Sequence, residues 1–416
     1  MGCRFDRWGA SLPAGETTMT TSPAAKSSGS WIAIGLCLLA AMLEGFDIAS
    51  MGVAAPKLVP DLGLSPGEAG TAFSASPFGL FVGALMAGPF ADRVGRKPVL
   101  LVSVVIFGLF SLATAWAQNL DVLLVIRFLC GVGLGGAMPM LLAMSSELAG
   151  EKRKALTVGL VTAGLPLGGA LVGLLARGDA AQADWRLIFI VGGAAPLLLA
   201  VVLWLFLPET RAKSADDVLS GDSLHALFGR ERLATTISLW LSFAAIALVL
   251  HLFLNWLPIL LGQRGIAPRD AAGIMTLFNI GGALGGLFAG WAIDRMGARR
   301  PFLGIFLLLM LVLIVLSGLT GATSLALFAF AAGFLIMAGQ FGLYALAPQH
   351  YGQKVRGVGV GAAVSAGRLG SVFGPLAAGA LLTGGATSGD VVMSTVPIVA
   401  IAGLAALALT KWGSRM

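Results

Sequence analysis

The chain has 416 residues, of which 57% are hydrophobic and only 11% carry a charged side chain. A soluble domain is about 45–50% apolar and about 25% charged, so this composition excludes a soluble globular fold and indicates a polytopic membrane protein. The net charge of +7 does not indicate nucleic-acid binding, because the basic residues lie in short loops between apolar segments. Loops of this kind set the orientation of a membrane protein. The lipid bilayer is therefore an expected partner and nucleic acid is not.

Residues 1–30 are polar and carry no apolar run, which predicts a disordered cytoplasmic tail. Apolar segments of roughly 20 residues, the length that spans a bilayer, then recur along the chain. They predict an all-α membrane protein with twelve transmembrane helices in two pseudo-symmetric six-helix bundles, 31–207 and 233–411. A cytoplasmic linker, 208–232, separates the bundles, and a short tail, 412–416, follows them. The expected helices are 31–55, 69–91, 99–118, 121–146, 155–176 and 186–207, then 234–261, 270–294, 302–319, 323–347, 356–383 and 392–411.

Orientation follows from the 27 Lys and Arg residues. Most of them lie in the tails and in the loops after every second expected helix, and such loops stay in the cytoplasm. We therefore expect a multi-pass protein of the bacterial inner membrane with both termini cytoplasmic.

Two acids interrupt the first apolar segment. Glu44 and Asp47 are three residues apart, so on a helix they share one face. A charged residue at membrane depth costs about 2.5–3.5 kcal/mol on insertion scales, and for that reason it usually has a function. The pair is typical of a proton relay or an ion-coupling site.

The chain also contains an internal repeat. The motif with Gly88, Asp92, Arg93 and Gly95 links the second and third expected helices, and the same residue types recur 202 positions later, where the eighth is linked to the ninth. A duplication in phase over half of the chain predicts two homologous six-helix halves, with a binding site between them near the midplane.

At these residues the chain resembles the major facilitator superfamily, whose signature is this loop. The resemblance implies two six-helix bundles that rock about a central cavity. In the family, the Asp and Arg of the loop bond across helix ends and hold the outward-open state. It therefore implies gate roles at the loop residues and at nearby helix ends, namely Gly88, Asp92, Arg93, Gly95, Asp294, Arg295, Glu147 and Arg356. His350 lies at a similar helix end, where structure or gating is expected rather than substrate contact.

A basic residue, Arg127, lies inside the segment 121–146. At 1.5 Å per residue it is ~10 Å from the outer end, while Asp47 is ~24 Å from the inner end of its own segment. Across a core of ~30 Å these depths coincide, so an Arg127–Asp47 interaction is expected within one half. It is either a fixed structural pair or part of proton coupling, and the resemblance of this stretch to the family's fourth-helix motif favours coupling.

A second intramembrane arginine, Arg368, lies ~18–20 Å deep in the segment 356–383. No acid other than Asp294, at a helix end, is available in its own half. Because a guanidinium suits a carboxylate, an anionic substrate is the simplest partner, and snorkelling to an interface is the alternative. Uncharged polar residues extend the predicted substrate-binding lining, although each alone is more often a packing residue: His251, Asn255, Asn279, Gln340 and Tyr344.

The resemblance extends to one branch of the superfamily. Glu44-Gly-Phe-Asp47, Asn255-Trp-Leu-Pro258, Gly339-Gln340 and Gly367-Arg368-Leu-Gly370 resemble motifs of the aromatic acid:proton symporter family. In its motifs the chain is most similar to the (3-hydroxyphenyl)propionate transporters, although many members of the family have Asp where this chain has Glu44. The resemblance implies proton-coupled uptake of a small aromatic carboxylate, with the proton as coupling ion. We expect the chain to function as a monomer.

Several alternatives stay open from the residues. Drug efflux by proton antiport is disfavoured by the helix-5 sequence Gly164-Leu-Pro166-Leu-Gly168-Gly169, which departs from the efflux motif by one residue. Sugar uptake is open because fold does not determine substrate. A membrane sensor would need a larger signalling domain. No enzyme, metal site or cofactor is expected, because Cys3, Cys37, Cys130 and the three His residues form no catalytic or ligand spacing.

Overall fold

The computed structural model describes residues 29–149, 153–210, 228–229, 232–351 and 356–412. Within these ranges the chain is helical and has no strand. The expected N-terminal tail and most of the expected linker, 208–232, lie outside them. The twelve long helices are α1 (Gly29–Asp61), α2 (Pro66–Val94), α3 (Arg96–Thr114), α4 (Leu120–Leu148), α5 (Lys154–Ala176), α7 (Arg186–Phe206), α9 (Leu233–Gly262), α10 (Pro268–Met296), α11 (Arg299–Gly318), α12 (Ala322–Leu346), α13 (Arg356–Thr383) and α14 (Ser388–Trp412). A short helix, α6 (Asp179–Ala183), and a 3₁₀ turn, η2 (Ala347–His350), complete the order.

Eleven of these helices are long and apolar enough to cross a membrane, and α13, which carries Arg368, is the twelfth long helix. Most helices run past the apolar segments that predicted them, and at α2 and α4 a side-chain cap sets the start. At the start of α2, for example, Ser65 and Glu68 form a capping box around Pro66, which satisfies free backbone N–H groups. The expected start at residue 69 was therefore three residues too late. The fold class expected from sequence is confirmed.

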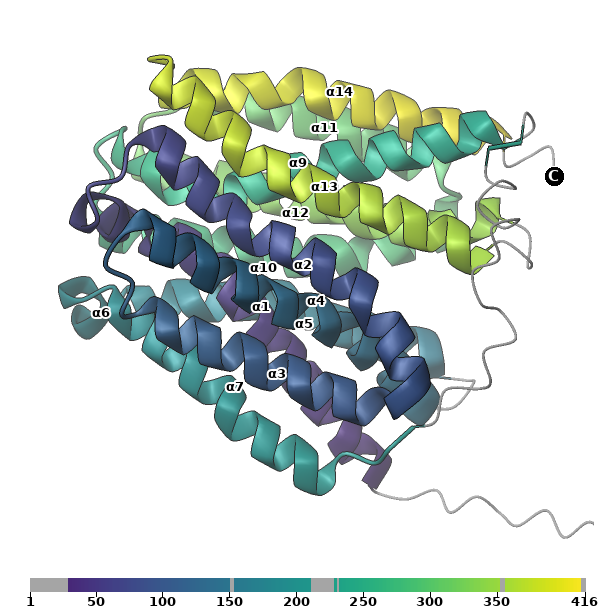
Figure 1. Cartoon of the computed structure of the whole chain (residues 1–416). Coiled ribbons are helices and arrows are strands. Elements are labelled where there is room, and N and C mark those ends of the chain that lie inside the picture. Colours follow the sequence, from purple (N-terminus) through teal and green to yellow (C-terminus); the bar gives the residue numbers. More distant parts are fainter. Residues whose placement is uncertain (1–28, 150–152, 211–227, 230–231, 352–355, 413–416) are drawn as a thin grey trace, which may run out of the picture.

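The internal repeat reappears in the packing. In the first six long helices, α1 packs against α5, α2 against α4, and α3 against both α4 and α7. In the second six, α9 packs against α13, α10 against α12, and α11 against both α12 and α14. Figure 1 shows the two sets as layers of purple-to-teal and green-to-yellow helices. The loop glycines of the repeat, Gly95 and Gly297, both have positive φ, at 96° and 71°, so each ends a helix in a conformation that favours glycine.

Glycines allow the paired helices to touch backbone to backbone. A Cβ at Gly83 of α2 would overlap the carbonyl oxygen of Val132 on α4, and one at Gly285 of α10 would overlap that of Phe334 on α12. The two contacts lie 202 residues apart along the chain. Small residues at membrane-helix interfaces permit such close approach, and here the same close-packed interface is present in both halves.

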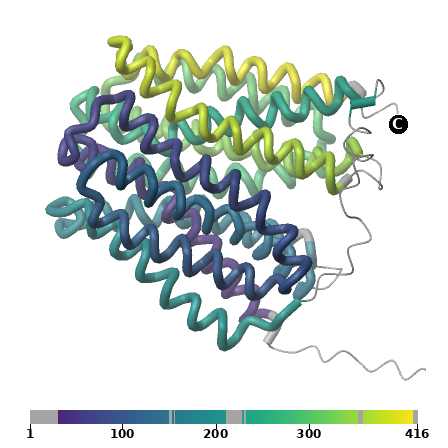
Figure 2. The backbone as a smooth tube through the Cα atoms, in the orientation of Figure 1, coloured from purple at the N-terminus to yellow at the C-terminus, as the bar shows by residue number. Residues whose placement is uncertain are grey.

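The two sets of helices meet through α2 with α13, α5 with α10, and α1 with α9. We call the end of the bundle with the α2–α3 and α10–α11 turns the basic face, because Arg93, Arg96, Arg295, Arg299 and Arg300 lie there. Figure 2 shows the described ends of the chain, near α1 and α14, on this same side. Close contacts between the two sets lie towards the opposite face, where a Cβ on Gly379 would lie 2.7 Å from the oxygen of Pro66.

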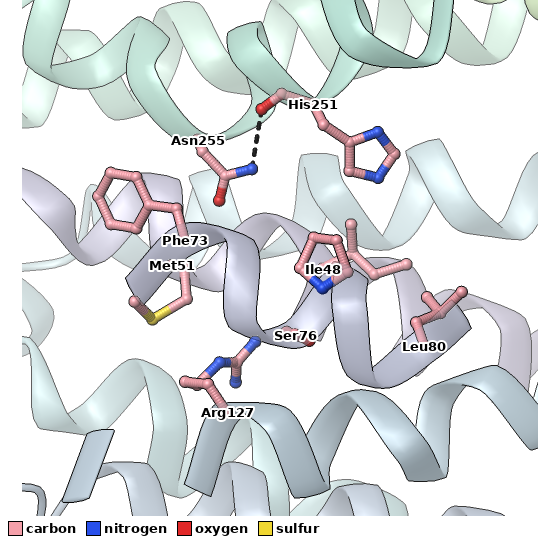
Figure 3. A pocket seen from close by; sticks show the side chains of 9 residues that line it. Ile48, Met51, Phe73, Ser76, Leu80, Arg127, His251 and Asn255 are labelled. Atoms are coloured by element: carbon pink, nitrogen blue, oxygen red, sulfur yellow. Dashed lines mark hydrogen bonds between the residues drawn. The ribbon is translucent and has the colours of Figure 1, made fainter. Parts of the chain in front are cut away.

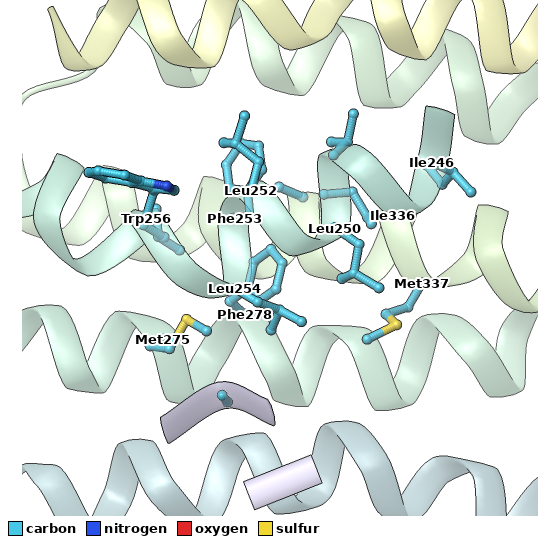
Figure 4. Packing of buried hydrophobic residues seen from close by; sticks show 14 of the residues in the cluster. Ile246, Leu250, Leu252, Phe253, Leu254, Trp256, Met275, Phe278, Ile336 and Met337 are labelled. Carbon is cyan, nitrogen blue, oxygen red and sulfur yellow. The ribbon is translucent and has the colours of Figure 1, made fainter. Parts of the chain in front are cut away.

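Helix α9 lies at the centre of the second half. Its side chains are buried on nearly all sides, and Figure 4 shows them among residues of α10 and α12. Phe253 stacks on Phe278 of α10 with ring centroids 6.0 Å apart, and Trp256 meets Phe73 of α2 edge-on at 5.2 Å. Because α9 is held by apolar contacts on both sides, its polar residues His251 and Asn255 have fixed positions.

Candidate functional site

The Arg127–Asp47 contact predicted from helix depth is present. Nη1 and Nη2 of Arg127 donate to Oδ1 and Oδ2 of Asp47 at 3.2 and 2.9 Å, and the side chains are 1% and 0% exposed. Ser111 of α3 donates to Oδ1 at 2.5 Å, and Cys130 Sγ lies 3.4 Å from Oδ2. The guanidinium also lies 5.7 Å from the ring centre of Phe189 on α7. The bidentate ion pair and the additional donors satisfy the hydrogen-bonding capacity of the Asp47 carboxylate. Together these contacts connect α1, α3, α4 and α7.

Glu44 differs from Asp47 in its surroundings. It is 1% exposed, and its Oε2 has no hydrogen-bond partner among the described residues. The charged groups that act on it are Arg368 of the other half and Asp47 of its own helix. A buried carboxyl group without a partner is costly when ionised, so Glu44 can exchange a proton without breaking an existing contact.

Arg368 is half-buried on α13, and its Nε is buried without a partner among the described residues. Its charge acts on Glu44 across the two halves and on His251 of α9. The second half offers it no carboxylate pair within the described residues. The guanidinium therefore has free hydrogen-bonding capacity close to two other titratable side chains.

A pocket lies between the two halves beside the buried ion pair (Figure 3). Its walls come from α1, α2 and α4 of the first half and from α9 of the second. Its polar lining consists of Ser76, Arg127, His251 and Asn255, and its apolar lining consists of Ile48, Met51, Phe73, Pro77 and Leu80. The lining combines an aromatic and aliphatic surface with a few polar groups, as small-molecule sites do. In this conformation the cavity is about 10 Å³, so the halves must separate here before an aromatic acid fits.

The other polar residues expected in the lining lie away from this pocket. Asn279 on α10 donates to Met275 O at 2.9 Å, and its amide oxygen faces Gly169 of α5, so it lies at the contact between the halves. Gln340 on α12 is buried, and its Oε1 has no partner among the described residues. Tyr344 packs edge-on against Phe243 at 5.1 Å. The structure thus groups His251 and Asn255 in the pocket but not the other three.

The expected gate residues are not engaged with one another. Asp92, Arg93, Asp294 and Arg295 are exposed, and within the described ranges none makes an ion pair or side-chain hydrogen bond. The cross-helix bond that the resemblance assigns to the outward-open state is therefore not formed in this conformation. Gly88 lies within α2, and Gly95 follows the end of that helix.

Other contacts stabilise the helix ends at the basic face. Glu147 pairs with Arg96, and Glu209 accepts from the backbone N of Arg96 and Lys97 at 3.1 and 3.2 Å, which caps the start of α3. His350 contacts two carbonyl oxygens, those of Leu346 and Leu409, each at 3.1 Å, which indicates a structural role. Arg356 begins α13, but its side chain lies outside the described residues.

Sequence reasoning missed several residues of the site. Cys130 was not among the expected site residues, although its spacing of three from Arg127 places both on one helix face. Ser111, Met51, Phe73 and Ser76 stand in apolar stretches with no pattern that distinguishes them. Only the packing of α2 and α3 against α1 and α4 reveals their position.

Comparison with known proteins now defines the family. The sequence pattern described as Major Facilitator Superfamily matches residues 37–375 and 239–413. The chain belongs to the major facilitator superfamily. It is therefore a membrane transporter and not an enzyme, as expected from the repeat loops.

Characterised members of the superfamily match most of the chain. The 3-(3-hydroxy-phenyl)propionate transporter of Escherichia coli is 40% identical over 397 residues, covering 95% of this chain and 98% of the relative. The gallate transporter of Pseudomonas putida is 36% identical, covering 85% and 86%. The 4-hydroxybenzoate transporter PcaK of Acinetobacter baylyi is 33% identical, covering 91% and 90%. The branch resemblance seen in the motifs is confirmed by these relatives.

Solved structures support the fold. The inward open xylose transporter XylE from Escherichia coli has a TM-score of 0.72 at 17% identity, covering 92% of this chain and 96% of that chain. A bacterial homologue of the human lysosomal transporter Spinster, inward-facing and occupied, has a TM-score of 0.73 at 19% identity, covering 93% and 97%. At such identities the similarity concerns architecture alone.

Proposed function

We propose that this transporter carries out proton-coupled uptake of an aromatic carboxylate across the bacterial inner membrane, with both termini in the cytoplasm. The class includes 3-(3-hydroxyphenyl)propionate and related phenylpropanoid or hydroxybenzoate acids, because relatives of this chain are named as transporters of such acids. The observation that carries the proposal is Arg368, a half-buried cation of α13 whose charge acts on Glu44 of the other half and whose Nε has no partner among the described residues. A carboxylate is the group that its planar fork binds best.

Glu44 is the proposed proton carrier. The sequence pattern placed Asp47 first and Glu44 second, but Asp47 is held by Arg127, Ser111 and Cys130. Protonation of Asp47 would weaken that network, whereas Glu44 Oε2 has no hydrogen bond to lose within the part of the chain that the structure describes. Asp47 and Arg127 then act as the scaffold that positions α1 beside α4.

Competition for Arg368 explains the coupling. Ionised Glu44 and a substrate carboxylate are both anions that favour the same guanidinium. A proton on Glu44 removes this rival charge, so substrate and proton bind together. Because the pair carries no net charge, its passage through the midplane avoids the cost of an isolated buried ion. Transport by one chain, without an oligomer, is part of the proposal.

The test is uptake of labelled 3-(3-hydroxyphenyl)propionate by cells, with and without a protonophore, for wild type, Glu44→Gln and Asp47→Asn. We expect the protonophore to abolish accumulation by the wild type. Glu44→Gln should lose accumulation and keep exchange of internal for external substrate, because binding no longer needs a proton.

Asp47→Asn should lose both activities together with folded protein, since it leaves Arg127 unpaired. Accumulation by Glu44→Gln that still collapses with the protonophore would place the coupling proton elsewhere. Uptake of a benzoate, without uptake of 3-(3-hydroxyphenyl)propionate, would identify a benzoate as the substrate. Drug resistance without uptake of any aromatic acid would support efflux instead.

A further inference from the structure

In the pocket beside Arg127, two side chains of α9 have hydrogen-bonding atoms without a partner among the described residues; these atoms are called the α9 edge. His251 and Asn255 are four residues apart, one helical turn or about 6 Å along the axis. Both are buried, and both line the pocket. Neither the Nε2 of His251 nor the Oδ1 of Asn255 has a hydrogen bond within the described residues. Neither atom is among the fully buried polar atoms without a partner, so each keeps some accessible surface. Figure 3 shows the amide oxygen of Asn255 turned towards the side chains of α1 and α2.

Their existing hydrogen bonds determine what these free atoms can do. Asn255 Nδ2 donates one of its two N–H groups to His251 O at 2.8 Å, which fixes the amide orientation and leaves the oxygen as a free acceptor. His251 Nδ1 lies 3.0 Å from Ala247 O. Because a carbonyl oxygen only accepts, Nδ1 carries the proton, and the neutral ring has an acceptor at Nε2. Arg368 acts electrostatically on this ring, and a second cation there would be repelled.

The wall facing this edge suits an aromatic ring. Phe73 is fixed by its edge-on contact with Trp256, at 5.2 Å between ring centres. Met51 and Ile48 of α1 complete the apolar surface. A flat ring gains from contact with an aromatic face and with a thioether. Two acceptors beside such a surface require a ligand with a hydrogen-bond donor on its ring.

We propose that His251 and Asn255 form a hydroxyl-recognition subsite that selects ring-hydroxylated aromatic acids over their unsubstituted and O-methylated analogues. The subsite rests on the proposed function, because it assumes that an aromatic carboxylate is the substrate. Arg368 binds the carboxylate end, and the phenolic O–H donates to the α9 edge. A ligand without this donor leaves buried acceptors unpaired, which costs binding free energy.

The experiment compares three acids as competitors of labelled 3-(3-hydroxyphenyl)propionate, both in uptake by cells and in binding to purified protein. They are the unlabelled substrate, 3-phenylpropionate and 3-(3-methoxyphenyl)propionate, whose ether oxygen accepts but cannot donate. We expect the second and third acids to compete roughly ten- to a hundredfold more weakly. Equal competition by the methoxy and hydroxy acids would overturn the subsite, even if uptake is otherwise as proposed.

Substitutions on α9 test whether the preference for the hydroxylated acid depends on this helix. Asn255→Leu keeps the side-chain size and removes the acceptor, so the preference for the hydroxylated acid should fall below about threefold. Ser242→Ala is the matched control, because Ser242 lies on the same helix but donates to Ala402 O at 3.1 Å, away from the pocket. If Asn255→Leu does not fold, the methoxy comparison on the wild type still decides. Absence of binding and uptake for every aromatic acid would overturn the proposed function and the subsite with it.

Discussion

At the scale of single residues, variants of the Arg127–Asp47 pair test whether the pair stabilises the fold or transfers the coupling proton. Both side chains are almost fully buried, and removal of one partner from a buried pair costs roughly 3–5 kcal/mol because the other charge is left unpaired. We therefore expect Asp47→Leu and Arg127→Met each to lower the free energy of unfolding by about that amount. The double variant should recover most of it, since apolar residues can replace a buried pair. Thermal unfolding in detergent measures all three.

The surface pair Arg96–Glu147 provides the control for this residue-scale prediction. Its side chains are 19% and 38% exposed, and exposed pairs contribute about 0–1 kcal/mol. Arg96→Met should therefore leave the unfolding temperature nearly unchanged. Proton-driven uptake should persist in the stable double variant if the buried pair is a scaffold. A stable double variant without any coupled uptake would contradict that assignment and return proton transfer to Asp47.

At the scale of helices, the glycine contacts predict where side chains are not tolerated. Gly83→Val and Gly285→Val each place atoms where a backbone carbonyl already lies, so α2 must separate from α4, or α10 from α12. Overpacking costs typically 1–3 kcal/mol, and backbone contacts leave less room to relax. We expect both variants to lose monodisperse protein in size-exclusion chromatography. Gly304→Val, on α11 with nothing within 4 Å of its Cβ position, should remain intact, and equal loss in all three would refute the packing argument.

Helices and repeats could be predicted from the sequence because they depend on local or periodic signals. Membrane length and hydropathy identify the helices, and the 202-residue offset between Gly95 and Gly297 follows from duplication. Depth along two helices was sufficient to predict the Arg127–Asp47 contact. The contacts of Ser111 and Phe73 could not be predicted, because a single Ser or Phe in an apolar helix does not indicate which neighbouring helix it faces. Asp47 is paired, whereas Glu44 Oε2 has no partner among the described residues. This contrast depends on how α1 is rotated among its neighbouring helices, which spacing alone does not determine.

At the scale of the whole molecule, the two halves are closed on one side. Close contacts between α2 and α13 and between α5 and α10 lie towards the face opposite the basic face, where Arg269 also pairs with Asp179 at 3.2 Å. On the basic face, Asp92 and Arg93 in the last turn of α2 are exposed, and neither makes an ion pair within the described residues. If the basic face is cytoplasmic, as the positive loops predict, this conformation is closed towards the outside. Glycine at the α2–α13 contact permits that closure.

A larger residue at Gly379 should therefore shift the population towards the outward-open conformation. Its Cβ would lie 2.7 Å from Pro66 O and 3.1 Å from the Cα of Gly70, contacts that are absent once the outer face opens. Ser74, 4% exposed and bonded to Val372 O at 2.7 Å, reports on opening when replaced by Cys. We expect Gly379→Leu to increase labelling of Ser74→Cys by an external, impermeant thiol reagent several-fold and to reduce uptake. Ala380→Leu, at an exposed neighbouring position, should change neither, and unchanged labelling in Gly379→Leu would show that closure does not depend on this contact.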